Sequence, residues 1–357
     1  MDKNSKIFIA GASGMVGSAI ERKLLDEGFS NLLTPSSRKL DLKNQLQTEE
    51  YFRANKPEYV FLSAAKVGGI LANSTYKAEF IYDNLIIATN VIHSSYKFGV
   101  KKLLNLGSSS IYSSETQQPM KEEYLLSGRL EPTSEPCAIA KIAAIKMCNS
   151  YNFQYGTDFI SLISGNLFGL NDNYSLEYSH LIPALIRKII LGKALMNNDF
   201  DFISRDFKLH QIGFGWDEKV KLSEKISLVS VLNSLGIFAE SVEFWGTGKP
   251  LREFMFVDDL ADACFYFMKN ISAKDLGEAG FVNIGNGKEV SIKDTVKKIS
   301  ELVDYSGKLE FDSLRPDGAL RKLLDGSKAL ELGWQPQFDF EDSLRVVIYD
   351  YVAEIKE

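Results

Sequence analysis

The stretch Lys6-Ile7-Phe8-Ile9-Ala10-Gly11-Ala12-Ser13-Gly14-Met15-Val16-Gly17 decides the fold of this chain. Its apolar beginning, Lys6 to Ala10, is typical of a buried parallel strand, and a helix is expected from about Met15 to Glu27. The G-x-x-G-x-x-G pattern between them permits a tight turn, close approach of a pyrophosphate and close packing of the helix. A purely structural turn is the alternative, but the strand–turn–helix setting favours a dinucleotide site. Its expected residues are Gly11, Ser13, Gly14, Met15, Val16 and Gly17.

Further strand-like runs follow the first one, with helical stretches between them. They lie at Tyr59–Leu62, Lys102–Leu106 and Phe159–Ile163, and the stretch from Asn84 to Phe98 reads as a helix. Strands that alternate with helices predict an α/β fold with a doubly wound parallel sheet of the Rossmann type. Residues 1–168 are expected to form this dinucleotide-binding domain, together with a returning segment at about 256–285.

The remaining residues predict a smaller substrate-binding lobe. It is expected to comprise 169–255 and 286–357, and it includes a helix around Ile182 to Leu191. Within it, residues 196–241 look like an insertion that contains one amphipathic helix, Glu218 to Leu235. No motif in this insertion can be attached to chemistry, although substrate selection and subunit contact are roles it could serve.

Composition narrows the range of functions. The chain has 357 residues, of which 45% are hydrophobic, and a formal net charge of -6, so no basic field favours nucleic acid. The three cysteines are odd in number and lack C-x-x-C spacing, which indicates neither disulfides nor a zinc site, and no metal is expected. Without an apolar leader or a membrane-spanning run, a cytoplasmic protein with a small-molecule substrate is expected.

The choice between NAD and NADP depends on the end of the second expected strand. No acidic residue stands there to hold a ribose 2′-hydroxyl; instead the chain has Ser36-Ser37-Arg38. A guanidinium can pair with a 2′-phosphate, which favours NADP(H), although exposed arginines are usually only solvated. Asp41 and Leu42 would then flank the adenine.

Several motifs in a fixed order carry a resemblance that covers nearly the whole chain. The chain resembles the extended short-chain dehydrogenases/reductases, and among them it is similar to the GDP-L-fucose synthases, the GDP-4-keto-6-deoxymannose epimerase-reductases. Reductases of this type also act on GDP-4-keto-6-deoxy-heptoses in capsule pathways. The motifs are Gly14-Met15-Val16-Gly17-Ser18-Ala19-Ile20, Ala64-Ala65-Lys66-Val67-Gly68-Gly69-Ile70, Gly107-Ser108-Ser109, Ser179-His180-Leu181-Ile182-Pro183-Ala184-Leu185, Trp245-Gly246-Thr247-Gly248, Arg252-Glu253-Phe254 and Arg321-Lys322-Leu323-Leu324-Asp325.

The resemblance implies a catalytic serine, tyrosine and lysine, with hydride supplied by the nicotinamide. The serine falls on Ser108 and the lysine on Lys141, whereas Cys137 occupies the tyrosine position. A thiol can donate a proton, but its side chain is several ångströms shorter than a phenol. Three explanations stay open: a substitution made to disable the enzyme, a natural variant with reduced or rerouted activity, and a relay through Cys137. An inert Cys137 is at least as plausible as an acid.

The family also moves protons at C3 and C5 with a cysteine and a histidine. The histidine corresponds to His180, but the cysteine falls on Ser110, and a hydroxyl is a far poorer base than a thiolate. The resemblance therefore implies a C4-keto reductase with weak or lost epimerase activity. It also implies that Ala64, Ala65, Lys141 and His180 line the cofactor site. Outside the family context, Lys141 would pass for a solvated lysine, and His180 for a helix cap or loop residue.

The nucleotide half of the substrate requires cations and ring or hydrogen-bonding groups. By resemblance, the phosphate and sugar contacts fall on Asn166, Arg187, Trp245, Arg252 and Lys322, each of which could instead be a surface residue. The guanine preference comes from the resemblance alone.

The leading hypothesis is an NADPH-dependent reductase of a GDP-4-keto-6-deoxy hexose or heptose in nucleotide-sugar biosynthesis. One alternative is a binding protein for NADP and nucleotide sugar that has lost its chemistry through Cys137. Another is a 3,5-epimerase without reductase activity. The resemblance also implies a homodimer built on a four-helix bundle, with Asn84–Phe98 and Cys137–Tyr155 contributed by each subunit.

Overall fold

The chain divides into two compact units, which are described separately. The computed structural model describes residues 1–315 and 317–356, and the side chains of Ile70 and Leu71 lie outside this description, Ile70 being the last residue of one motif quoted above. Unit 1 comprises Met1–Leu167, Glu253–Lys288 and Lys322–Gln337. Unit 2 comprises Phe168–Arg252, Glu289–Arg321 and the described part of the C-terminal segment that begins at Phe338. The segment Lys322–Gln337 was expected in the substrate lobe, but its contacts place it in unit 1.

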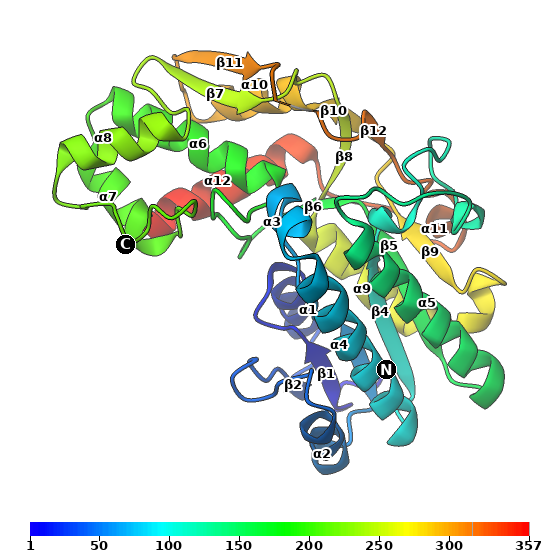
Figure 1. Ribbon diagram of the computed structural model, residues 1–357. Coiled ribbons are helices and arrows are strands. Elements are labelled where there is room, and N and C mark those ends of the chain that lie inside the picture. Colours follow the sequence, from blue (N-terminus) through cyan, green and yellow to red (C-terminus); the bar gives the residue numbers. More distant parts are fainter. Residues whose placement is uncertain (316, 357) are drawn as a thin grey trace. The chain divides into compact units, whose positions relative to one another are not determined.

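Unit 1 contains a six-stranded sheet with the strand order β2-β1-β3-β4-β5-β9 (Figure 1). Each neighbouring pair is parallel, which confirms the predicted α/β fold of the Rossmann type. The strands are β1 (Ile7–Ala10), β2 (Leu32–Leu33), β3 (Tyr59–Leu62), β4 (Lys102–Ser108), β5 (Phe159–Ser164) and β9 (Phe281–Ile284). The order reverses at β1, and in such sheets ligands bind beyond the carboxyl ends of the strands at this reversal.

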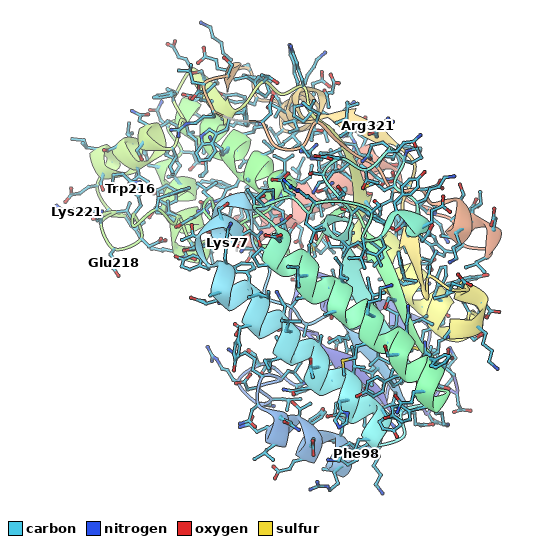
Figure 2. All side chains as sticks on the ribbon, turned by 45° about the vertical axis from the view of Figure 1, so that its right-hand side comes forward. Lys77, Phe98, Trp216, Glu218, Lys221 and Arg321 are labelled. Carbon is cyan, nitrogen blue, oxygen red and sulfur yellow. The ribbon has the colours of Figure 1, made fainter. Side chains whose placement is uncertain are left out.

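Helices cover both faces of the sheet because successive strand residues point to opposite sides. Ile7 and Ile9 of β1 pack in one core with residues of α1 and α9, while Phe8 and Ala10 pack in another with residues of α2, α4 and α5. In Figure 2, the labelled Lys77 and Phe98 mark the two ends of α4. The helices of unit 1 are α1 (Met15–Asp26), α2 (Gln45–Asn55), α3 (Ile70–Thr75), α4 (Lys77–Lys97), α5 (Glu135–Tyr155), α9 (Val257–Asn270) and α11 (Ser327–Glu331), with single turns η1 (Ser109–Ile111), η2 (Glu122–Tyr124) and η3 (Ala273–Leu276).

Unit 2 is built mainly from helices, with one parallel strand pair between β7 and β11. Its elements are α6 (Leu181–Met196), α7 (Phe200–Leu209), α8 (Lys225–Ser234), β7 (Ser241–Trp245), β10 (Glu289–Ser291), α10 (Ile292–Leu302), β11 (Lys308–Asp312) and α12 (Phe340–Lys356). The chain also passes from one unit to the other within three further strands. They are β6 (Asn166–Phe168), β8 (Leu251–Phe256) and β12 (Arg321–Lys322).

The insertion at 196–241 contains two helices, whereas one was expected. The predicted helix from Glu218 begins only at Lys225, and Trp216, Glu218 and Lys221 lie on the non-helical segment before it (Figure 2). The helix α7 was not predicted from the sequence. Its start is nevertheless capped in the usual manner, since the Asp199 carboxylate accepts a hydrogen bond from the Phe202 amide.

Arg187 is a fully buried residue of unit 2 whose side chain binds several segments of that unit. Its Nε and one terminal nitrogen donate to the Asp206 carboxylate at 3.0 and 2.8 Å. The remaining N–H groups donate to backbone carbonyls of Tyr174, His210 and Gln211. The prediction that Arg187 contacts the substrate is therefore wrong, because all five donors of its guanidinium are used inside the protein.

This network predicts a large loss of stability for Arg187→Met. The substitution leaves the Asp206 carboxylate, also fully buried, without its cation, and such a loss costs about 3–5 kcal/mol. Denaturant unfolding followed by tryptophan fluorescence measures the change. The double variant Arg187→Met/Asp206→Leu should recover part of it. Unchanged stability with weakened nucleotide-sugar binding would contradict this structural role.

Candidate functional site

The glycine turn after β1 is shaped by two close backbone approaches. A Cβ at Gly11, whose φ is +90°, would lie 2.7 Å from the backbone of Ala64, and a Cβ at Gly17 would lie 2.1 Å from the Gly11 carbonyl oxygen. At Gly14 the same construction meets only that oxygen, at 3.6 Å. Gly11 and Gly17 are therefore required by the fold itself. Gly14 is not, which leaves room for an external group to approach the backbone there.

The N-terminus of α1 suits an anion. Its N-cap is Gly14, which provides no side-chain capping hydrogen bond, and its first turn carries no acidic residue. The partial positive charge of a 12-residue helix is therefore not offset locally. This end of the helix follows β1 at the reversal of strand order, and the turn contacts Ala64 just after β3. The residues thus fit a pyrophosphate, as the sequence predicts.

The segment after β2 carries the residues expected at the adenosine end. Arg38 is exposed, and among the described residues it has no ion pair. Asp41 is exposed and accepts a hydrogen bond from the Lys43 amide, while the Leu42 carbonyl accepts one from the Asn90 side chain at 2.8 Å. A guanidinium without an internal partner remains available for a phosphate.

The serine cluster lies at the carboxyl end of β4. Ser108 is the last residue of the strand, and its Oγ accepts a hydrogen bond from the Ser110 amide at 3.4 Å. Ser109 is buried, whereas Ser108 and Ser110 are partly exposed. The Lys141 ammonium donates to the Leu106 carbonyl at 2.7 Å and so fixes α5 to this end of the strand. The structure therefore brings Ser108 and Lys141 to the same edge of the sheet.

Cys137 and Lys141 lie one helical turn apart on α5 and influence each other. Burial lowers the pKa of Lys141 to about 8, and the Cys137 thiol partly opposes this shift. Burial raises the pKa of Cys137 to about 11, which the nearby lysine partly offsets. At neutral pH the thiol is therefore protonated, while the lysine is charged but readily deprotonated.

Two asparagines that the sequence analysis did not single out surround the Cys137 thiol. The thiol donates to the Asn73 side-chain oxygen at 3.2 Å, and the Asn84 amide nitrogen lies 3.8 Å from the sulfur. Asn84 is itself held by the backbone of Lys66 and Phe80. An asparagine on a helix carries no sequence signal for such a contact, so only the fold could reveal it.

Tyr112, the tyrosine closest to the serine cluster in sequence, does not take the place of the missing phenol. It is buried, and its hydroxyl donates to the Asn283 side chain at 2.6 Å. Burial also raises its pKa, which makes the phenol a weaker acid. Tyr112 therefore belongs to the structural core around η1.

The expected substrate residues are divided between the units. Asn166 and Lys322 belong to unit 1, where the Asn166 amide donates to the Glu253 carbonyl at 3.1 Å. Trp245 and Arg252 belong to unit 2, as does His180, which was expected at the catalytic and cofactor sites. The structure places the residues of each unit within that unit. That the residues of both units form one substrate site remains a prediction.

His180 is the N-cap residue of α6, and its imidazole makes no capping hydrogen bond. Desolvation lowers its pKa, so the ring is neutral at neutral pH. Trp245 ends β7 with an exposed ring, and the Arg315 guanidinium, which sequence reasoning missed, lies 5.0 Å from its centre. Arg252 donates to the Leu251 carbonyl, and burial lowers its pKa against the opposing effect of Asp317.

Comparisons with known proteins show the family and the fold of this chain. The model of the NAD dependent epimerase/dehydratase family matches residues 7–207 and 222–285. A putative GDP-L-fucose synthase 2 of Arabidopsis thaliana is 46% identical over 355 residues, which cover 99% of this chain and 94% of the relative. A crystal structure of a GDP-6-OMe-4-keto-L-xylo-heptose reductase from Campylobacter jejuni is 40% identical with a TM-score of 0.93, covering 99% of both chains. A GDP-mannoheptose C4 reductase from the same organism, with NADP bound, is 40% identical with a TM-score of 0.86, covering 98% of this chain and 99% of the other.

The two kinds of glycine in the turn predict opposite phenotypes. Gly17→Ala places a methyl group against the Gly11 carbonyl and should destabilise the protein by about 1–3 kcal/mol. Gly14→Ala has space for its methyl group and should fold normally, but it should weaken NADPH binding because the methyl group occupies the approach to the pyrophosphate. Thermal unfolding and NADPH titration measure the two effects. Normal NADPH affinity in Gly14→Ala would argue against this position of the cofactor.

Proposed function

The chain belongs to the NAD dependent epimerase/dehydratase family, and from this premise we propose that it is an NADP-dependent reductase. The reaction is reduction of the C4 carbonyl of a GDP-linked 4-keto-6-deoxy sugar. The observation that carries the proposal is the placement of Ser108 and Lys141 at the carboxyl end of β4, in the sheet whose first turn fits a pyrophosphate. Bound NADPH would supply the hydride.

The cofactor site follows from the exposed groups of unit 1. The turn from Gly11 to Gly17 and the N-terminus of α1 hold the pyrophosphate, and Arg38 pairs with the 2′-phosphate. Asp41, Leu42, Ala64 and Ala65 border the adenosine. The Lys141 ammonium retains donors beyond the one used on Leu106, and these bind the nicotinamide ribose. His180 is proposed at the same end of the cofactor.

The hydrogen-bond donor and the proton donor for the C4 oxygen can be assigned to residues of this chain. The Ser108 hydroxyl donates a hydrogen bond to the C4 oxygen and stabilises the negative charge that develops as hydride arrives at C4. That oxygen must also acquire one proton to become a hydroxyl. Cys137 occupies the donor position, but its thiol hydrogen is directed to Asn73 and its pKa is about 11. The thiol is thus a weak acid, and we infer a slow but competent reductase.

Epimerisation is proposed to be weak. It requires a base on each side of the exchanging carbons, and Ser110 provides only a hydroxyl in place of a thiolate. His180, whose neutral imidazole can accept a proton, would be left without its partner. The substrate contacts are proposed to be Asn166, Trp245, Arg252 and Lys322, which supply two cations, an amide and an exposed ring.

Two competing functions remain testable within the same site. A protein that binds cofactor and nucleotide sugar without turnover is favoured by the anomalous Cys137 alone. A 3,5-epimerase without hydride transfer is favoured by the availability of His180. The reductase is preferred because Ser108 and Lys141 keep the arrangement that hydride transfer to a carbonyl requires.

We also propose a cytoplasmic homodimer built on α4 and α5. The strongest support is the apolar and aromatic character of these helices, on which Tyr82 and Phe153 are highly exposed and the rings of Tyr96 and Tyr155 stack at 4.1 Å. Sedimentation equilibrium tests the dimer. The three cysteines are free, which suits a reducing compartment. Among the described residues, no helix is long and apolar enough to cross a membrane.

The thiol at position 137 predicts that Cys137→Tyr accelerates the reaction. A phenol reaches farther than a thiol, and the nearby Lys141 ammonium lowers the pKa of a phenol at this position, so kcat should increase by about 100-fold, the low end of what a positioned acid contributes. NADPH oxidation with GDP-4-keto-6-deoxymannose and its heptose counterpart measures the change. Cys137→Ser serves as the matched control and should not accelerate turnover.

Ser108→Ala and Lys141→Met should abolish the activity of both the Cys137 protein and Cys137→Tyr. Equal rates for the Cys137 protein and Cys137→Tyr would mean that the thiol completes proton transfer efficiently. Inactivity of both, with intact binding of NADPH and GDP, would favour the binding protein.

The lowered pKa of Lys141 predicts pH-dependent cofactor binding. Because its pKa is about 8 in the free protein, the ammonium loses its proton as the pH rises through this value, and the bond to the ribose weakens. The Kd for NADPH should therefore increase from about pH 7 to about pH 9, before most of the Cys137 thiol ionises. The Kd is measured by fluorescence titration, and Lys141→Met is the control, in which the Kd should depend less on pH. The same pH dependence in both proteins would show that another group titrates.

A further inference from the structure

Glu253 is a buried carboxylate that no step of the proposed reaction uses. It lies on β8, and its side chain is only 1% exposed. Its Oε1 accepts hydrogen bonds from the amides of Asn286 and Gly287 at 2.7 and 2.8 Å, and its Oε2 accepts one from the Leu324 amide at 3.1 Å. One carboxylate therefore binds two chain segments that are distant in sequence, both within unit 1.

The surrounding backbone is adapted to this carboxylate. A Cβ at Gly285 would lie 2.8 Å from Oε1, so a side chain there would displace Glu253. A Cβ at Gly165 would lie 3.4 Å from Oε2, at the near limit of ordinary van der Waals contact. Gly165 immediately precedes Asn166 in the chain. The glycines on both sides thus accommodate a group that the fold keeps in one position.

Glu253 is connected to two expected substrate residues. Its backbone carbonyl accepts the Asn166 side-chain amide at 3.1 Å. Its carboxylate holds Leu324, two residues after Lys322 on the same extended segment. The same segment is also held by the pairing of β12 with β8 and by contacts to Gln118 and Met120, where the Leu323 amide donates to the Gln118 side chain and the Met120 amide donates to the Leu323 carbonyl. Removal of the Glu253 contact would therefore loosen one of several anchors, the one that lies on the carboxyl-terminal side of Lys322 and comes from a buried charge.

We propose that Glu253 is a positioning residue for the nucleotide-sugar subsite, where its carboxylate fixes the backbone that carries Lys322 and its carbonyl fixes the amide of Asn166. This proposal rests on the proposed function, because it assigns Lys322 and Asn166 to the GDP-linked substrate. Glu253 itself touches neither substrate nor cofactor. Its effect is expected on substrate affinity and not on the hydride-transfer step.

The chemistry of the side chain suggests a conservative test. Three backbone donors converge on Glu253, and a carboxylate has enough lone pairs for all of them. In Glu253→Gln one oxygen becomes an NH2 group, which cannot accept a hydrogen bond. The amide can keep Asn286 and Gly287 on its oxygen, but then its donors face the Leu324 N–H, and burial excludes a rescuing water. The segment with Lys322 should therefore be released first.

The experiment measures GDP and NADPH binding by calorimetry, and kcat and KM for GDP-4-keto-6-deoxymannose, in this protein and its variants. Glu253→Gln should lower the affinity for GDP and raise the KM for the sugar substrate, each by about tenfold, which corresponds to the loss of one hydrogen bond to a charged group. The affinity for NADPH and kcat should stay nearly unchanged. The matched control is Glu289→Gln. It removes the charge of a partly buried carboxylate that pairs with Arg321, the neighbour of Lys322 that is labelled in Figure 2. This variant should bind GDP normally.

A double-mutant cycle separates positioning from general destabilisation. If Glu253 acts through Lys322, then Glu253→Gln should add little to the effect of Lys322→Met. Glu253→Asp, which keeps the charge but has a shorter reach, should give an intermediate loss of GDP affinity and covers the case in which the glutamine variant does not fold. Additive effects, or GDP affinity that is unchanged in both variants of Glu253, would overturn the proposal. GDP binding without turnover would instead refute the reductase while leaving this proposal testable.

Discussion

The contact of α1 with the ends of β1 and β3 is the constraint on which the candidate site depends. Gly11 and Gly17 allow backbone atoms to approach to distances that no side chain would permit, and Gly11 abuts Ala64. This contact places the N-terminus of α1 at the reversal of strand order, where the sheet leaves space for a ligand. The hydrogen bond from Lys141 to Leu106 then brings α5 to the same edge. The proposed meeting of cofactor and reacting carbonyl at this edge depends on both contacts.

Much of unit 1 could be predicted from the sequence, because its strands are continuous apolar runs and its glycine turn has a fixed meaning. The positions of Ser108 and Lys141 followed from the same pattern together with the family resemblance. The insertion was harder, since α7 is short and its apolar side chains, such as Phe202 and Phe207, become meaningful only when they pack. Arg187 was misassigned because sequence cannot distinguish an arginine that binds phosphate from one that pairs with a buried Asp206.

The departures from the family pattern acquire physical meaning in the structure. Cys137 is not simply a shortened acid, because its thiol donates to Asn73 and burial keeps it protonated. Ser110 supplies a backbone amide to Ser108 and offers no thiolate. On these grounds we propose a site that retains the components for reduction, lacks one component for epimerisation and delivers the final proton through a weak acid.

The central claim is hydride transfer from the cofactor to C4 of the sugar. The most direct measurement uses NADPH that carries deuterium at the transferable position, with GDP-4-keto-6-deoxymannose as substrate, and locates the label by mass spectrometry and NMR. The account predicts one deuterium at C4 of the product, and no solvent hydrogen exchanged into C3 or C5. Cofactor and GDP binding with no label at C4, or solvent exchange at C3 and C5 in an unreduced sugar, would contradict it.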